Sequence, residues 1–270
     1  IPPLERFDLD DILMLIDQKK YFVLHAPRQT GKTTCMLALM AHLNKEDKYH
    51  VLYINVEAAQ AAREDVYKGI RAVVNEIGER AELYLDDSSL KKIWPDILNS
   101  YGENSALNNL LTHWSKNSSR PVVLIIDEID SLVGDTLISV LRQIRSGYDK
   151  RPANFPQSII LCGVRDVRDY RIHSDKDKSI ITGGSAFNIK AESLRLGDFV
   201  KPEIKSLLMQ HTKQTGQKFT SDAVDRIWDY TLGQPWLVSA LAYETCFKIK
   251  KNRGRSIDIT ENMVVQAKEN

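Results

Sequence analysis

Residues 26–33 carry the side chains and the backbone freedom that binding a chain of phosphates requires. They read Ala-Pro-Arg-Gln-Thr-Gly-Lys-Thr, follow the apolar run Tyr21–Leu24, and lead into an apolar-periodic helix. Strand, loop and helix in this order, with Lys32 and Thr33 at the start of the helix, match the pattern G-x-x-x-x-G-K-[ST], except that Ala26 replaces the first glycine. A loop that enters a helix offers unpaired N–H groups and the positive end of the helix dipole to an anion. The stretch therefore predicts a site for a nucleoside triphosphate.

Each residue type in this loop has a chemical reason. Gly31 lets the backbone approach the phosphates closely, and Lys32 reaches the β- and γ-phosphates. The hydroxyl of Thr33 is a ligand for Mg²⁺, which prefers oxygen and keeps part of its water shell. An ordinary strand-to-helix turn would leave Lys32 unexplained. The predicted nucleotide contacts come from the whole loop: Ala26, Pro27, Arg28, Gln29, Thr30, Gly31, Lys32, Thr33 and Thr34.

Two carboxylates end a second apolar run and supply the other half of the predicted chemistry. Val122–Ile126 are mostly β-branched and suit a strand buried on both faces, and Asp127 and Glu128 follow directly. Ligands bind at the carboxyl ends of strands in parallel sheets. We therefore expect Asp127 to hold Mg²⁺, directly or through water, and Glu128 to orient and polarise an attacking water. Asp130 either assists them or caps the next helix.

Other polar residues at strand ends are further candidates. Arg165 follows the apolar strand predicted at 158–163, where it would sense the γ-phosphate if that strand neighbours the one ending at Asp127. Asn55 and Glu57 share a face at the end of the strand predicted at 51–56, and contacting the γ-phosphate region or capping the next helix remain equal alternatives. Arginines on the helix predicted from Thr136 to Gly147 either clamp a phosphoryl group or form a solvated basic face, the second being favoured.

The composition and net charge of the chain limit the classes of protein to which it can belong. The chain has 270 residues, 43% hydrophobic and 27% charged, with a net charge of +1, which exerts no global pull on nucleic acid or an anionic membrane. No apolar run approaches the length of a membrane span, and no secretory signal precedes the first strand, so we expect a cytoplasmic protein. The cysteines lack metal-binding spacing and suit buried, reduced thiols. Because the first residue is not Met, we expect a fragment of a longer chain.

The order of apolar runs predicts an α/β fold followed by helices. Strands separated by helices of ten or more residues favour parallel pairing. Residues 63–118 are predicted to be helical, 166–184 to form a long loop, and 187–190 to form a fifth, short strand. From about Leu194 the pattern becomes helical throughout. The predicted helices are Lys201–Thr215, Ser221–Thr231, Pro235–Lys250 and Thr260–Lys268.

Taken together, these motifs resemble the AAA+-type P-loop ATPases, and more narrowly the STAND class of signalling NTPases and related bacterial ATP-binding proteins. The residues that carry the resemblance are the loop at 26–33, Asp127-Glu-Ile-Asp130, Gly163-Val-Arg165 and Gly233-Gln-Pro235. Together they span nearly all of residues 5–250. The first two motifs are shared by many P-loop ATPases, whereas the Gly-x-Pro motif points to STAND proteins.

The resemblance implies a three-layer P-loop NTPase domain with a parallel sheet of order 5-1-4-3-2, here residues 1–194, and a small all-helical lid, residues 195–270. It implies that a further C-terminal region follows. It also implies that Pro235, together with Trp236, lies near the adenine and couples nucleotide state to lid position. The chain lacks an evident lid arginine for the phosphates and a clear arginine-finger motif, which puts ring assembly in doubt.

The function expected is that of a slow ATPase switch. ATP and Mg²⁺ would bind between the two domains, Glu128, Lys32 and Arg165 would act in hydrolysis, and lid movement would be the output. One alternative is a non-hydrolysing module that holds ATP or ADP, against which Glu128 argues. Another is a nucleic-acid-associated ATPase, which the near-neutral charge does not indicate. The run Lys248–Arg255 suits a solvated turn better than a nucleic-acid arm. A protein partner or self-association is expected, and a membrane is not.

Overall fold

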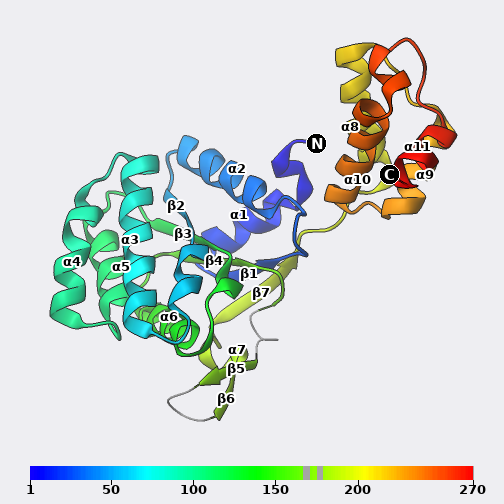
Figure 1. The fold of residues 1–270 in the computed structure, drawn as a ribbon. Helices are drawn as coiled ribbons and strands as arrows, with labels where there is room; N and C mark the ends of the chain where they lie inside the picture. Colours follow the sequence, from blue (N-terminus) through cyan, green and yellow to red (C-terminus); the bar gives the residue numbers. More distant parts are fainter. Residues whose placement is uncertain (167–170, 175–178, 270) are drawn as a thin grey trace. The chain divides into compact units, whose positions relative to one another are not determined.

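The computed structural model describes residues 1–166, 171–174 and 179–269, and the chain in it forms two compact units (Figure 1). The α/β unit comprises Asp8–Pro27 and Lys32–Arg195. The helical unit comprises Leu196–Asn270 together with Ile1–Phe7 and the loop tip Arg28–Gly31. Within the described residues, no helix is long and apolar enough to cross a membrane.

The α/β unit is built on a five-stranded parallel sheet. Its strands lie in the order β2-β3-β4-β1-β7, which confirms the predicted order 5-1-4-3-2 once they are counted along the chain. The strands are β1 (Tyr21–His25), β2 (His50–Asn55), β3 (Val122–Asp127), β4 (Ser158–Gly163) and β7 (Lys190–Arg195). The first four are buried along nearly their whole length, so both of their faces are covered.

Helices cover both faces of this sheet, as a three-layer fold requires (Figure 1). One set of alternating strand residues, including Val23, Ile54 and Ile126, packs in a single core with the helices between β2 and β4. The helices that precede and follow β1 lie on the other side of the sheet. The first set is α3 (Val66–Leu85), α4 (Ser89–Tyr101), α5 (Ala106–Asn117) and α6 (Gly134–Ser146); the second is α1 (Leu9–Asp17) and α2 (Lys32–Lys45).

The segment between β4 and β7 differs from the prediction. The sequence predicts one long loop over 166–184, but Arg171–Ser174 (β5) and Ser179–Thr182 (β6) pair antiparallel, and α7 (Gly183–Ala186) follows. Residues 167–170 and 175–178 of the expected loop lie outside the described residues. The fifth sheet strand is Lys190–Arg195, not 187–190, because its register with β1 begins at Lys190.

The helical unit follows the predicted pattern closely. Helices α8 (Lys201–Thr215) and α9 (Ser221–Thr231) have the predicted bounds, and α11 spans Glu261–Glu269. The cap of α9 is Thr220, whose hydroxyl accepts from the N–H of Ala223. The helix expected at 235–250 is shorter: α10 (Pro235–Tyr243) passes into a π-helical turn, Glu244–Lys248. A separate apolar core, including Ile204, Ile227 and Val264, holds these helices together.

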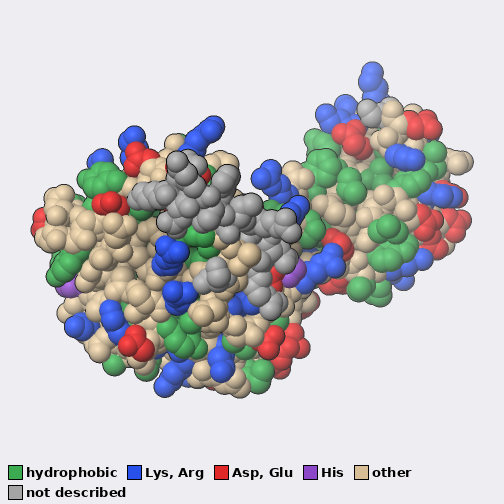
Figure 2. Space-filling model, turned by 90° about the horizontal axis from the view of Figure 1, so that it is seen from below, with side chains coloured by type: hydrophobic (Ala, Val, Ile, Leu, Met, Phe, Trp, Pro, Cys, Tyr) green, Lys and Arg blue, Asp and Glu red, His purple; other side chains and the backbone are tan. Residues whose placement is uncertain are grey.

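The surface carries charges of both signs. On the face seen in Figure 2, Lys and Arg side chains are interspersed with Asp and Glu side chains over the α/β unit. This agrees with the net charge of +1. Large apolar side chains also reach the surface of the helical unit, among them Trp236 (50% exposed) and Tyr243 (52% exposed).

Candidate nucleotide-binding site

The phosphate-binding loop begins where β1 ends and is held to β4 by the backbone. The N–H of Ala26 donates to the carbonyl oxygen of Gly163 over 3.1 Å, and Ala26 is fully buried. Ala26 is not among the residues with positive φ, so alanine costs nothing at the position where the motif has glycine. Lys32 is only 5% exposed, and its Nζ donates to the carbonyl oxygens of Ala26 (2.8 Å) and Pro27 (3.2 Å).

These contacts show how the loop holds a buried ammonium group through its own carbonyl oxygens. A buried lysine needs hydrogen bonds to offset the loss of water, and the loop's own carbonyls supply them. To bind a phosphate, Lys32 would have to exchange these carbonyl oxygens for phosphate oxygens. Thr33, the next residue, lies in the first turn of α2, where an anion is also stabilised by the helix dipole.

The tip of the loop groups with the helical unit, and an arginine that sequence reasoning missed holds it there. Arg6 Nη1 donates to the carbonyl oxygen of Thr30 (3.1 Å), and its Nη2 donates to that of Gly197 (2.6 Å). The guanidinium carbon lies 4.4 Å from the ring centre of Phe199. Gln29 and Gly31 have φ of 61° and 87°, so the loop turns through left-handed conformations there. No local pattern could have revealed Arg6, because its contacts are distant in sequence.

Asp127 is the centre of the polar network at the end of β3. It is fully buried, and its Oδ2 accepts from Thr33 Oγ1 (2.7 Å) and from the hydroxyl of Tyr53 (2.8 Å). Its Oδ1 accepts from the N–H of Glu128 (2.9 Å). Tyr53 is the second residue that sequence reasoning missed, since it lies within the apolar run of β2. The register explains the contact, because β2 and β3 pair along their whole length with Asn55 opposite Asp127.

The donor set fits Mg²⁺. Thr33 Oγ1 and Asp127 Oδ2 are oxygens held side by side, the ligand type that Mg²⁺ prefers, and Mg²⁺ takes one or two such protein ligands together with phosphate oxygens and water. No group of three or more His, Cys, Asp or Glu side chains in the described residues forms a metal cage of its own. Bound here, the ion would neutralise charge on the β- and γ-phosphates.

Glu128 lies beside this pair in a left-handed backbone conformation, with φ of 57° and ψ of 39°. Burial, and then the negative charges of Asp127 and Asp130, raise the pKa of its carboxyl, while Lys32 acts in the opposite direction. Residues held in such backbone conformations often lie at functional sites. A half-buried carboxylate with a raised pKa is suited to accept a hydrogen bond from a nucleophilic water.

The remaining candidates lie at the ends of strands or on α6. Asp130 Oδ1 accepts from the N–H of Val164 (3.2 Å), so it ties the chain after β3 to the chain after β4. Asn55 Oδ1 accepts from the N–H of Glu57 (2.8 Å), which forms an Asx turn before the 3₁₀ helix Glu57–Ala62; that helix has no side-chain cap. Arg165 is exposed two residues beyond β4. Its role and the clamp role of the α6 arginines stay predictions.

The Gly-x-Pro motif opens α10 in the helical unit. Pro235 is the first residue of that helix, and Gln234 Oε1 accepts from the N–H of Leu237 (2.6 Å) as its cap. Gly233 has φ of 85°, and its carbonyl accepts from the N–H of Phe199 (2.8 Å). The motif is therefore fixed to the segment that Arg6 also contacts. The contact of Pro235 with a nucleotide stays a prediction.

Within the α/β unit, the structure thus brings together Lys32, Thr33, Asp127 and Glu128. Thr33 and Asp127 hydrogen bond directly, Glu128 follows Asp127, and the charge of Lys32 acts on the pKa of Glu128. Such a group can bind phosphate, hold a divalent cation and polarise a water. It has the parts that phosphoryl transfer to water requires.

Solved structures with a similar fold cover nearly the whole chain. Cdc6p from Pyrobaculum aerophilum matches with a TM-score of 0.60 and 17% identity, over 98% of this chain and 65% of that chain. The Walker-type ATPase Paby2304 of Pyrococcus abyssi matches with a TM-score of 0.59 and 17% sequence identity. The match covers 97% of this chain and 71% of that chain. Orc1 from Aeropyrum pernix, solved in complex with DNA, matches with a TM-score of 0.56 and 14% sequence identity. The match covers 99% of this chain and 64% of that chain.

At these identities the likeness establishes the fold alone. The chain spans less than two thirds of the length of the Orc1 and Cdc6p chains (64% and 65%). A search of curated proteins found no match.

A family model supplies the assignment that the fold comparison leaves open. The model of the AAA domain matches residues 16–170, which include β1, the phosphate-binding loop, the Asp127-Glu128 pair and β4. More than half of the chain is matched, and the matched part contains the site described above. The chain therefore belongs to the AAA-domain family of P-loop ATPases.

Proposed function

We propose that the protein binds ATP with Mg²⁺ and hydrolyses it slowly to ADP. The observation that carries the proposal is the buried Asp127, whose Oδ2 accepts from Thr33 and Tyr53 beside a carboxylate, Glu128, that burial and neighbouring charges hold at a raised pKa. A protein that only bound the nucleotide would gain nothing from a carboxylate next to the γ-phosphate. The AAA-domain family assignment supports the same activity.

Each residue of the site has a separate role in this reaction. Lys32 moves its donors from the carbonyls of Ala26 and Pro27 to the β- and γ-phosphates, and backbone N–H groups of the loop bind the remaining oxygens. Thr33 and Asp127 hold Mg²⁺. Glu128 orients the water that attacks the γ-phosphorus in line, and Lys32 stabilises the charge that develops on the equatorial oxygens.

We further propose that the nucleotide acts as a switch, as in STAND proteins. The loop tip Arg28–Gly31 belongs to the helical unit, where Arg6 holds the Thr30 carbonyl and the segment at Gly197. A phosphate that reorders the loop would therefore change the contact of Thr30 with Arg6. Pro235 would transmit the presence of the adenine in the same way. Arg165 would sense the γ-phosphate.

Phosphate release by the purified protein tests the hydrolysis. With Mg²⁺ and ATP, the Glu128→Gln variant should lose release by at least about a hundredfold while it still binds a fluorescent ATP analogue, since removal of an interaction made in the transition state leaves ground-state binding intact. Glu79→Gln is the matched control, because Glu79 is an exposed carboxylate on α3. That control should hydrolyse normally.

The two alternatives give different results in this assay. If the unmodified protein binds ATP but releases no phosphate at any Mg²⁺ concentration or pH, the protein is a nucleotide-binding module and the proposed hydrolysis is wrong. If Glu128→Gln releases phosphate at the normal rate, hydrolysis occurs but Glu128 does not position the water.

A further inference from the structure

An exposed stack of aromatic side chains lies where α10 passes into its π-helical turn. The rings of Tyr243 and Phe247 are 5.1 Å apart at an interplanar angle of 20°, and the guanidinium carbon of Arg255 lies 4.4 Å from the centre of the Phe247 ring. Tyr243 is 52% exposed and Phe247 41% exposed. The π-helical turn spans Glu244–Lys248, so it contains Phe247. Such turns are rare and are frequently found at functional sites.

Four basic residues follow the stacked rings closely along the chain. Lys248 Nζ lies 5.9 Å from the ring centre of Tyr243, and Lys250, Lys251 and Arg253 follow in a short 3₁₀ helix. All four side chains belong to exposed residues, and none forms an ion pair with another described residue. Elsewhere on the surface, lysines such as Lys91 do pair with carboxylates.

In the segment 243–255, side-chain hydrogen bonds to backbone carbonyl oxygens fix the path of the chain, and they do not neutralise the positive charges. Arg253 Nε donates to the carbonyl oxygen of Phe247 (2.7 Å), and Arg255 Nη1 donates to that of Cys246 (3.0 Å). Asn252 is fully buried and its Nδ2 donates to the carbonyl oxygen of Thr245 (2.7 Å). The positions of the rings and of the basic segment are therefore fixed relative to each other.

We propose that this aromatic-basic surface, formed by Tyr243, Phe247, Lys248, Lys250, Lys251 and Arg253, binds single-stranded nucleic acid. Unpaired bases stack on exposed aromatic rings, while the phosphates between them are neutralised by lysine and arginine. Both halves of that chemistry are present here within one short stretch of the chain, 243–255. The proposal goes beyond nucleotide hydrolysis and does not depend on it.

An acidic protein segment is the competing occupant, and the geometry favours it less. Such a segment would use the cations but would gain little from the stack, in which Arg255 covers one ring, Phe247, and the other ring, Tyr243, suits a stacked base. A duplex is also disfavoured, because its bases are already stacked and its phosphates alone would contact the surface.

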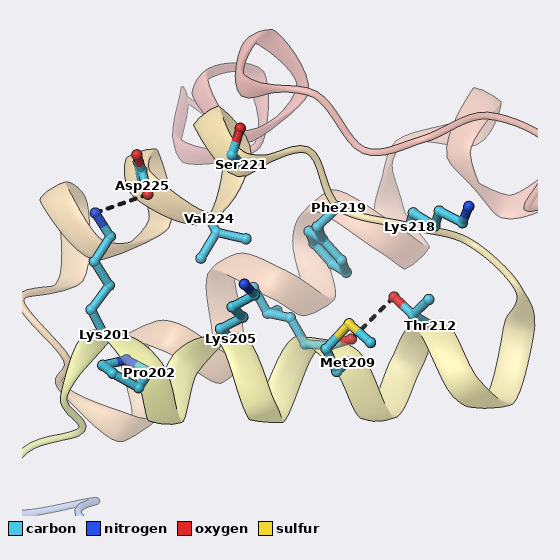
Figure 3. A pocket seen from close by; sticks show the side chains of 11 residues that line it. Lys201, Pro202, Lys205, Met209, Thr212, Lys218, Phe219, Ser221, Val224 and Asp225 are labelled. Atoms are coloured by element: carbon cyan, nitrogen blue, oxygen red, sulfur yellow. Dashed lines mark hydrogen bonds and ion pairs between the residues drawn. The ribbon is translucent and has the colours of Figure 1, made fainter.

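The groove between α8 and α9 provides a matched control for charge (Figure 3). It encloses about 680 Å³ and has Lys205 and Lys218 at its edges, both exposed and without an ion pair to another described residue. The side chains of Met209 and Phe219 lie between them in the groove. These lysines belong to the same unit as the aromatic-basic surface but have no stacked pair of aromatic rings beside them.

The experiment measures fluorescence anisotropy of labelled 20-nucleotide dT and rU probes with the full chain, without nucleotide and at low salt. We expect both probes to bind, with a logarithmic salt dependence of about −0.7 per neutralised phosphate, and a 20-base-pair duplex to bind more weakly. Tyr243→Ala should weaken binding about tenfold, whereas Tyr243→Phe should retain it because the ring remains. The dT and rU arms show whether DNA, RNA or both are accepted.

The charge variants distinguish this surface from general electrostatic attraction. The double change Lys250→Glu and Lys251→Glu should weaken binding at least tenfold, and Lys205→Glu with Lys218→Glu should change it less than twofold. Equal loss in both double variants, no effect of Tyr243→Ala, or no binding of either single strand at low salt would each overturn the proposal. So would polyglutamate binding as tightly as dT, because the surface would then be one for acidic proteins. Phosphate release is measured separately, so a failure of hydrolysis leaves this result unaffected.

Discussion

At the scale of single residues, the arrangement around Asp127 is the most informative. One carboxylate oxygen, Oδ2, accepts from two hydroxyls, those of Thr33 and Tyr53, while the other accepts a backbone N–H. A fully buried carboxylate needs such donors to offset its loss of hydrogen bonds to water. If Thr33 and Asp127 held Mg²⁺ as proposed, Tyr53 would be the side-chain donor that remains on Oδ2. Tyr53 would then orient the proposed metal ligand Asp127 through this hydrogen bond.

Replacing Tyr53 with Phe removes this orientation and little else, because the ring continues to fill the same space. We expect the Mg²⁺ concentration for half-maximal phosphate release to rise about tenfold, as is typical when a hydrogen bond to a metal ligand is lost. A magnesium titration at saturating ATP measures it. Tyr101→Phe, at a residue that is 57% exposed, should leave the titration unchanged. An unaltered magnesium requirement in Tyr53→Phe would show that Asp127 is oriented without it.

The raised pKa of Glu128 predicts how the rate of phosphate release depends on pH. Burial is the main cause that raises this pKa, and the charges of Asp127 and Asp130 add to it. In the proposed mechanism Glu128 acts as the ionised carboxylate, so we expect the rate to fall as pH drops through the raised pKa. Asp130→Asn removes one negative charge, lowers the pKa of Glu128, and should shift the acidic limb of the pH–rate profile to lower pH. Asp96→Asn on α4 is the control, and an acidic limb that stays in place or moves upward in Asp130→Asn contradicts the assignment.

At the scale of elements, the turn between α9 and α10 is fixed by a glycine that cannot be replaced cheaply. Gly233 has φ of 85°, and a Cβ added there would lie 1.9 Å from the carbonyl oxygen of Phe199. The added Cβ would collide with a backbone atom of Phe199, which cannot move away as easily as the end of a flexible side chain. The same two residues share a backbone hydrogen bond. The geometry of the turn thus depends on the missing side chain.

Gly233→Ala should therefore lower the stability of the protein by about 3 kcal/mol, the strain of positive φ plus a collision. Gly216→Ala is the matched control, since Gly216 has φ of 78° but a methyl group there would meet nothing within 4 Å. It should lose only about 1 kcal/mol. Thermal unfolding of both variants measures the difference, and equal losses would mean that the collision is relieved by movement of Phe199.

Comparison of sequence and structure at this scale shows which patterns predict elements well. The bounds of helices α8 and α9 can be predicted to the residue. Helix α8 has a proline in its first turn and ends at a glycine in the left-handed region. Helix α9 begins after a threonine cap and ends at a leucine in the left-handed region. The antiparallel pair β5 and β6 escapes prediction, since four-residue strands in a polar segment carry too little alternation to be recognised. The π-helical turn after Tyr243 escapes it because it interrupts a helix without any proline or glycine.

The site is predictable only where local sequence encodes it. Lys32, Thr33, Asp127 and Glu128 lie in short motifs with their own chemistry, so they can be named from the sequence. The roles of Arg6 and Tyr53 cannot be predicted from the sequence in this way. Their roles arise from contacts between segments far apart in the chain, which depend on register and loop path and not on neighbouring residues.

At the scale of the whole molecule, nucleotide binding should raise stability by linkage. With Mg²⁺ and ATP at a hundred times the dissociation constant, about 2.7 kcal/mol is added, which corresponds to a rise in Tm of roughly 5–10 °C. Lys32→Ala should lose most of this rise, whereas Lys45→Ala at the exposed end of the same helix should keep it. An identical shift in both variants would show that Lys32 does not bind the phosphates.

The position of β1 in the sheet also has a consequence for synthesis of the chain. This strand lies between β4 and β7, whose residues begin only at Ser158 and Lys190. On the ribosome, the strand that leads into the phosphate-binding loop therefore stays unpaired on both edges until most of the chain has emerged. Unpaired strand edges invite pairing with other chains. Premature termination before Ser158, which leaves both edges of β1 unpaired, should accordingly give insoluble products, whatever the stability of the finished protein.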